Sequence, residues 1–113
     1  EQVHRAGLGH HVASIVALNA SVTEIRQASD DLYHRLLSLA QRCLDEDEAD
    51  VIILGCASMS YSFADRLAAD LPVPVLHAPR VALKVAEMLA GARLSHSKKA
   101  YPVPPNLGRE TMI

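Results

Sequence analysis

The sequence predicts an α/β domain built on a parallel sheet with helices on both faces. Short apolar runs of strand-like composition alternate along the chain with segments in which apolar residues recur at helical spacing. This alternation favours parallel strands joined by helical crossovers. The 113 residues fit one small domain, and because half of them are hydrophobic, a core can form without disulfide support.

The first segments are predicted to be a helix, a strand and a loop. Glu1–Leu8 is helix-like and meets a break at Gly7-Leu8-Gly9. His11–Leu18 is rich in valine and isoleucine, which is typical of a strand. Residues 19–29 are polar and turn-prone, so we expect a loop or a short helix there. Because the chain opens without Met, we expect either a piece of a longer protein or a trimmed N-terminus.

The next predicted element is a long helix. Asp30 or Asp31 can cap it, and it runs to about Glu48. Its apolar residues share one face and are Leu32, Leu36, Leu39, Ala40, Cys43 and Leu44. We therefore interpret Cys43 as part of the core.

A strand and a second helix follow. Val51–Leu54 is an unbroken apolar run, which predicts a strand covered on both sides. Ser58 or Ser60 is expected to open a helix that extends to about Leu71, where Pro72 ends it.

The last elements complete the alternation. Val73–Leu76 predicts another buried strand, and Pro79 suits the first turn of a helix over Pro79–Ala92. Leu94–Ile113 is rich in proline and reads as an extended tail. We accordingly divide the chain into an α/β domain, residues 1–93, and a C-terminal tail, residues 94–113.

Composition argues against several classes of partner. The net charge of −2 and the pI near 6.3 provide no general attraction to nucleic acid or to anionic membranes. The two cysteines match neither a disulfide-rich secreted pattern nor the spacing of zinc ligands. No stretch predicts a signal peptide or a bilayer-spanning helix. We expect a cytoplasmic protein with no metal, nucleic acid or membrane partner.

The candidate site lies at Gly55–Met59, because ligands of parallel sheets bind beyond the carboxyl ends of strands. Gly55 allows a tight turn and close approach, and Cys56 comes directly after the strand. The amides of Ala57, Ser58 and Met59 open the next helix, where free N–H groups favour negative charge. Such amides lower the pKa of a thiol and can hold an enolate or carboxylate oxygen of a substrate. A cysteine in this place can equally be a small packing residue.

Four segments resemble one family. Ala49–Met59 (ADVIILGCASM) resembles the signature of the aspartate/glutamate/hydantoin racemase superfamily, most closely its hydantoin and allantoin racemase branch. The other segments resemble that branch in the same order: Leu71–Val75, Val81–Glu87, and the tail Leu94–Lys98 with Tyr101-Pro102. The resemblance is close over Asp30–Pro105 and looser over Glu1–Val22.

The resemblance implies a two-lobed, pseudo-symmetric fold and a mechanism without cofactors. In this family two cysteines face each other across a cleft, and one removes the proton from the chiral carbon while the other delivers a proton to the opposite face. Cys56 matches the cysteine of the C-terminal half, so this chain corresponds to the C-terminal portion. The expected substrate is a 5-substituted hydantoin or allantoin, and we expect a homo-oligomer. The facing cysteine lies outside this chain, so the chain alone is expected to be inactive.

Two positions depart from the family pattern. Ser58 stands where the family has glycine, and its hydroxyl can cap the helix or reach the substrate. His77 stands where the family usually has aspartate after the second strand. It can hydrogen-bond near Cys56, assist proton transfer or fill a structural position. The departure at His77 leaves the exact substrate open.

Two other functions stay open from the sequence. One is a single-cysteine decarboxylase or cis–trans isomerase of the same superfamily, in which Cys56 would protonate an enediolate or attack a double bond. The other is a non-catalytic, truncated domain retained for assembly or ligand binding.

Overall fold

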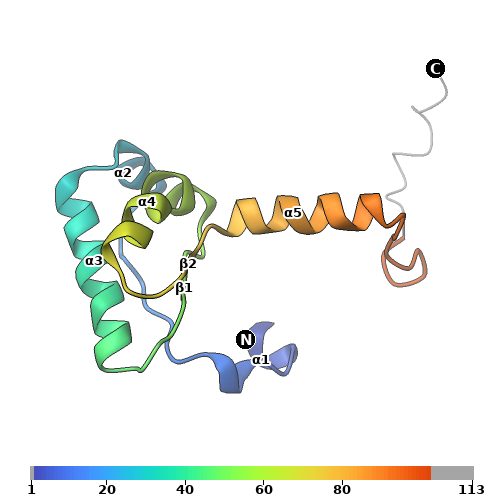
Figure 1. Cartoon of the computed structure of the whole chain (residues 1–113), viewed down its shortest axis with the longest axis horizontal. Coiled ribbons are helices and arrows are strands. Elements are labelled where there is room, and N and C mark those ends of the chain that lie inside the picture. The colour runs from blue at the N-terminus through green and yellow to red at the C-terminus, as the bar shows by residue number, and fades with distance from the viewer. Residues whose placement is uncertain (1, 103–113) are drawn as a thin grey trace. The chain divides into compact units, whose positions relative to one another are not determined.

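The computed structural model describes residues 2–102 and has the predicted α/β class (Figure 1). The chain divides into two compact units at the boundary between Val81 and Ala82. In order, the elements are α1 (Gln2–Arg5), a 3₁₀ turn (Gly9–His11), α2 (Val22–Gln27), α3 (Asp30–Asp45), β1 (Ile52–Ile53), α4 (Ala57–Asp70), β2 (Val75–Leu76) and α5 (Ala78–Gly91). No helix among residues 2–102 is long and apolar enough to cross a membrane.

The sheet consists of β1 and β2, which pair in parallel as predicted. Ile52 lies opposite Val75 and Ile53 opposite Leu76. The amide of Ile52 also donates to the carbonyl of Pro74 at 2.9 Å, one residue before β2. Because α4 connects the strands, their carboxyl ends meet at one edge of the sheet.

The helix starts differ from the predictions by one to a few residues. The Ser29 hydroxyl, not Asp30 or Asp31, caps α3 by accepting the Leu32 amide N–H at 3.3 Å. The two aspartates occupy the first turn instead, where they complement the helix dipole. Neither Ser58 nor Ser60 opens α4, because the helix begins at Ala57 and Cys56 itself is the residue before its first turn.

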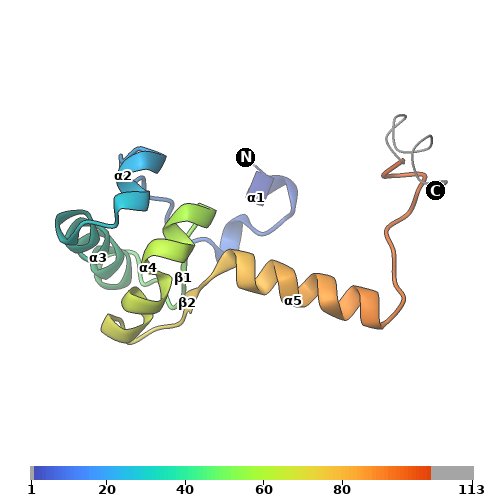
Figure 2. The same cartoon turned by 90° about the horizontal axis from the view of Figure 1, so that it is seen from above.

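The core lies between α3, α4 and the strands, and α4 lies between α3 and the strands in both views (Figures 1 and 2). Its buried apolar residues are Leu18, Ile25, Leu32, Tyr33, Leu36, Ala40, Leu54, Phe63, Ala64, Leu67 and Leu71. Cys43, which we predicted to lie in the core, is half-buried.

Tyr33 is a core residue that the apolar pattern of α3 did not include. It is almost fully buried, and its hydroxyl donates a hydrogen bond to the Asp70 carboxylate at the end of α4. The Arg66 guanidinium lies 3.7 Å from the centre of the Tyr33 ring and bonds the Asp30 carboxylate at 2.6 Å. Burial and the Asp70 carboxylate raise the pKa of Tyr33 to about 12. These contacts join the N-terminal half of α3 to α4.

The strand predicted at His11–Leu18 was wrong, and the burial predicted for the strands at Val51–Leu54 and Val73–Leu76 was wrong in part. His11–Leu18 forms no strand, and of its apolar residues only Leu18 is buried, while Ile15 is 82% exposed. A segment of strand-like composition forms a strand only where a neighbouring strand pairs with its backbone N–H and C=O groups. Val51–Leu54 was predicted to be covered on both sides, but Ile53 is 62% exposed and its register partner Leu76 is exposed as well. The face of the sheet that carries these two residues is open within the first unit.

The other predicted elements agree with the structure or are shifted. Residues 19–29 contain the short helix α2, whose Ser21 and Glu24 form a reciprocal capping box. The first helix is shorter than predicted, and Gly7 breaks the chain with a φ of 71°. Pro79 lies in the first turn of α5, and α5 has no buried residue among those described. Within the predicted tail, residues 103–113 lie outside the described residues.

We predict that Leu67→Ala destabilises the first unit by about 2–5 kcal/mol, since a fully buried leucine is removed from the α3–α4 core. Leu8→Ala is the matched control, because Leu8 is half-exposed in the same unit and its loss should cost less than about 0.5 kcal/mol. Urea unfolding followed by circular dichroism measures both values. Equal losses for the two variants would contradict this assignment of the core.

Candidate active site

Cys56 lies where the sequence predicts, between the carboxyl end of β1 and the first turn of α4. Its backbone is extended, with φ −125° and ψ 131°, and its side chain is partly exposed. The Ser60 hydroxyl is buried beneath this turn and donates to the Leu54 carbonyl at 3.4 Å. The end of the strand is thereby tied to the helix that follows.

Gly55 plays a narrower part than predicted. Its φ lies outside the left-handed region, so the turn does not require glycine. A Cβ added at Gly55 would meet no atom within 4 Å. The glycine therefore leaves open space beside Cys56, which agrees with the expected close approach of a ligand but not with the expected tight turn.

The first turn of α4 stabilises the thiolate of Cys56. The backbone N–H of Met59, followed by that of Ser58, holds the pKa of the Cys56 thiol below its ordinary value. The Ser58 side chain adds to this effect, and burial opposes it. Two of the three predicted amides, those of Met59 and Ser58, thus lower the pKa of the thiol, whereas the amide of Ala57 does not. Met59 is half-buried and packs against the core.

His77 ends β2 at the same edge of the sheet. Since Ile53 and Leu76 are opposite each other, the residues that follow them, Leu54 and His77, leave the sheet at the same level. His77 is 7% exposed, and its Nδ1 accepts the Arg80 amide N–H at 3.3 Å. The described residues therefore show His77 bonded to the start of α5 rather than to Cys56.

The Nδ1 contact determines the form of the imidazole. A neutral ring whose Nδ1 accepts a hydrogen bond carries its proton on Nε2. The Nε2 atom is buried and has no hydrogen-bond partner among the described residues. His77 therefore offers one N–H group without an acceptor.

Three residues beside His77 were missed from the sequence. The Tyr61 ring meets the His77 ring edge to face, with centroids 4.8 Å apart and planes at 81°. The Arg80 guanidinium binds the Asp65 carboxylate through two hydrogen bonds of 2.6 and 2.8 Å. This ion pair holds the pKa of Asp65 below its ordinary value. A helical spacing of four residues between Tyr61 and Asp65 was the signal in the sequence, but their partners, His77 and Arg80, lie outside α4.

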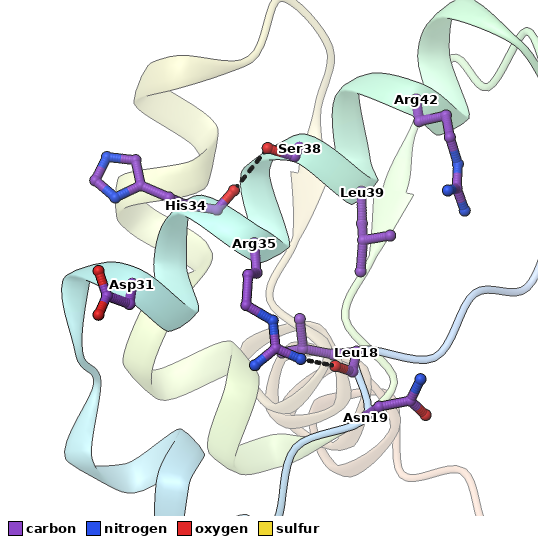
Figure 3. A pocket seen from close by; sticks show the side chains of 8 residues that line it. All are labelled: Leu18, Asn19, Asp31, His34, Arg35, Ser38, Leu39 and Arg42. Atoms are coloured by element: carbon purple, nitrogen blue, oxygen red, sulfur yellow. Dashed lines mark hydrogen bonds between the residues drawn. The ribbon is translucent and has the colours of Figure 1, made fainter.

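A depression of about 750 Å³ along α3 is no competing site (Figure 3). Its lining residues are Leu18, Asn19, Asp31, His34, Arg35, Ser38, Leu39 and Arg42. Arg35 donates to the Leu18 carbonyl at 3.0 Å and Ser38 to the His34 carbonyl at 2.9 Å, so both side chains are engaged by backbone. His34 and Arg42 point in opposite directions, and the polar groups do not converge. Among residues 2–102, no cluster of three His, Cys, Asp or Glu residues could hold a metal ion.

Comparisons with known proteins identify the family of this chain. The family model described as Asp/Glu/Hydantoin racemase matches residues 1–86. The hydantoin racemase of Paenarthrobacter aurescens is 35% identical over 105 residues, which are 92% of this chain and 44% of that protein. The hydantoin racemase of Rhizobium meliloti is 35% identical over 99 residues, which are 85% of this chain and 41% of that protein.

A solved structure resembles the fold. The crystal structure of allantoin racemase from Pseudomonas fluorescens superposes with a TM-score of 0.80 at 28% sequence identity. The match covers 92% of this chain and 44% of the allantoin racemase chain. This chain thus spans less than half the length of the relatives that it matches.

We predict that the alkylation of Cys56 by iodoacetamide has a midpoint pH below about 8.5, the ordinary value for a free thiol. The lowered pKa means that more thiolate, the reactive form, is present at any pH below that value. Cys43→Ser provides a chain with Cys56 as its only thiol, and mass spectrometry measures the rate from pH 6 to 10. The same variant unfolded in urea is the control, and its midpoint should rise to about 8.5. Equal midpoints in the folded and unfolded chain would contradict the effect of the α4 amides.

Proposed function

Because the chain belongs to the Asp/Glu/hydantoin racemase family, we propose that it forms one half of a racemase acting on a 5-substituted hydantoin or on allantoin. Cys56 supplies one of two thiols that exchange the proton at the chiral carbon. The observation that carries the proposal is the position of Cys56 at the end of β1, where the amides of Met59 and Ser58 lower the pKa of its thiol. A thiol whose pKa is lowered in this way supplies more thiolate, the basic form, at a given pH below its ordinary pKa.

The proposed reaction is a proton transfer in two directions. The Cys56 thiolate takes the proton from C5 of the ring, which is acidified by the adjacent carbonyl, and becomes a thiol. The electron pair of the broken C–H bond moves onto the carbonyl oxygen, and the free N–H groups at the start of α4 stabilise this enolate. A second thiol then delivers a proton to the opposite face of C5. In the reverse direction the two thiols exchange roles, and the scheme consumes no cofactor.

The second thiol is not Cys43. This residue lies near the end of α3, and its carbonyl accepts the Ala49 amide N–H at 3.0 Å in the turn that leads into β1. Helix α3 therefore carries Cys43 to the edge of the sheet where β1 begins, opposite the edge where Cys56 lies. We assign the second thiol to a second lobe outside this chain, and we propose that the assembled protein is a cytoplasmic homo-oligomer.

The other predicted site residues take supporting parts in this proposal. Gly55 leaves room for the substrate, and the amides of Ala57, Ser58 and Met59 face the developing negative charge. His77 directly follows β2, at the edge of the sheet that carries Cys56.

We predict that Cys56→Ser lowers the racemisation rate by about 100-fold or more in a protein that contains both lobes, because a serine hydroxyl is a far weaker acid than a thiol and forms almost no anionic base near neutral pH. Polarimetry of a single enantiomer of 5-methylhydantoin measures the rate. Cys43→Ser is the matched control and should stay within about twofold of the unchanged protein, since it lies away from the edge of the sheet that carries Cys56.

Each alternative function has its own outcome in this experiment. Full racemase activity in Cys56→Ser would contradict the role of Cys56 and favour a non-catalytic domain. In a parallel assay with a 2-substituted malonic acid, which unlike 5-methylhydantoin has a carboxyl group to lose, release of carbon dioxide would favour a single-cysteine decarboxylase. This chain alone, assayed in parallel, should not change the optical rotation beyond the buffer rate, because it lacks the facing acid and base.

A further inference from the structure

Tyr61 is an exposed aromatic residue with a fixed environment. It lies on the second turn of α4, five residues after Cys56, and 73% of its surface is exposed. Side chains of a helix incline toward its N-terminus, so a residue covers the turn that precedes its own Cα. The Tyr61 ring therefore inclines toward the end of α4 at which Cys56 lies.

His77 determines where the Tyr61 ring rests. The two rings meet edge to face at 4.8 Å, a geometry that aromatic rings favour because of their quadrupoles. His77 cannot shift easily, because it is buried and its Nδ1 bonds the Arg80 amide N–H. Since His77 ends β2 beside the end of β1, the Tyr61 ring lies at the edge of the sheet that carries Cys56.

An ion pair between Asp65 and Arg80 lies close to this contact in the sequence, since each residue follows one of the two rings by about one turn. Asp65 lies one turn after Tyr61 on α4, and its paired hydrogen bonds with Arg80 join α4 to the first turn of α5. The exposed Tyr61 ring is thus held by the His77 ring, and the ion pair lies beside this contact.

We propose that Tyr61 stacks on the planar ring of the substrate and that His77 is the positioning residue that holds Tyr61 in place. This inference rests on the proposed function, which supplies a flat, five-membered amide ring as substrate. A flat ring beside Cys56 can present C5 to the sulfur while its face lies on an aromatic ring. The structure gives Tyr61 the features of such a contact: a fixed position at the correct edge and a large open surface.

The test is a titration of the isotope-labelled chain with 5-methylhydantoin, followed by nuclear magnetic resonance. We expect saturable shifts of the Tyr61 ring signals together with the amides of residues 57–59. Tyr61→Phe keeps the ring and should bind within about twofold, whereas Tyr61→Ala should bind about 3- to 10-fold more weakly, the range that aromatic contacts contribute. The matched control is Tyr101→Ala, because Tyr101 is 66% exposed and meets His96 edge to face at 5.4 Å in the other unit. It should leave binding unchanged.

The positioning role of His77 has a separate readout. His77→Gln should weaken binding in the unchanged chain but add no further loss in the Tyr61→Ala variant, since His77 acts through Tyr61. A variant that merely unfolds is recognised by loss of its dispersed amide spectrum. Additive losses would overturn the positioning role.

The remaining outcomes separate this inference from the proposed function. Shifts at residues 57–59 with equal affinity in Tyr61→Ala would overturn stacking by Tyr61 and leave the role of Cys56 intact. Tyr61 signals that respond to protein concentration instead of 5-methylhydantoin would overturn it in favour of a protein interface. Absence of shifts at Tyr61 and at residues 57–59 would overturn it as well, and the Cys56→Ser racemisation experiment would then decide on the proposed function alone.

Discussion

The parallel pairing of β1 with β2 is the constraint on which the site depends. Because Ile53 and Leu76 are register partners, the chain leaves both strands at the same edge. Cys56 and His77 therefore face the same region although 20 intervening residues separate them in the sequence. An antiparallel pairing, or a parallel pairing slipped by several residues, would separate the thiol from His77 and from the Tyr61 ring. The core between α3 and α4 maintains this register by holding the crossover helix in place.

Much of this fold follows from local patterns. The apolar spacing of α3 and the apolar runs at β1 and β2 predict the order of elements, because each pattern lies within one element. Burial of Tyr33 could not be predicted in this way, because its hydroxyl needs the Asp70 carboxylate 37 residues away. The strand predicted at His11–Leu18 did not form, because composition cannot tell whether a neighbouring strand will accept its hydrogen bonds.

The candidate site likewise contains residues that local patterns predict and residues that they do not. Cys56 and the amides of Ser58 and Met59 are consecutive in the sequence, so a strand followed by a helix was enough to predict a stabilised thiolate. The contact of His77 with Tyr61 depends on how the chain that follows β2 returns to α4, and no local pattern encodes it. The family resemblance could not supply it either, because His77 departs from the family pattern at that position. The structure thus adds an exposed aromatic ring, Tyr61, which contacts His77.

The central claim is that Cys56 exchanges a proton with C5 of a hydantoin ring. Deuterium incorporation at C5, followed by nuclear magnetic resonance in deuterated water, tests it most directly in a protein that contains both lobes. Starting from one enantiomer of 5-methylhydantoin, the account predicts that the product of opposite handedness carries deuterium at C5 and keeps every carbon. It also predicts that Cys56→Ser slows the formation of this product by about 100-fold or more. Inversion without deuterium, or undiminished inversion with deuterium in Cys56→Ser, would contradict it.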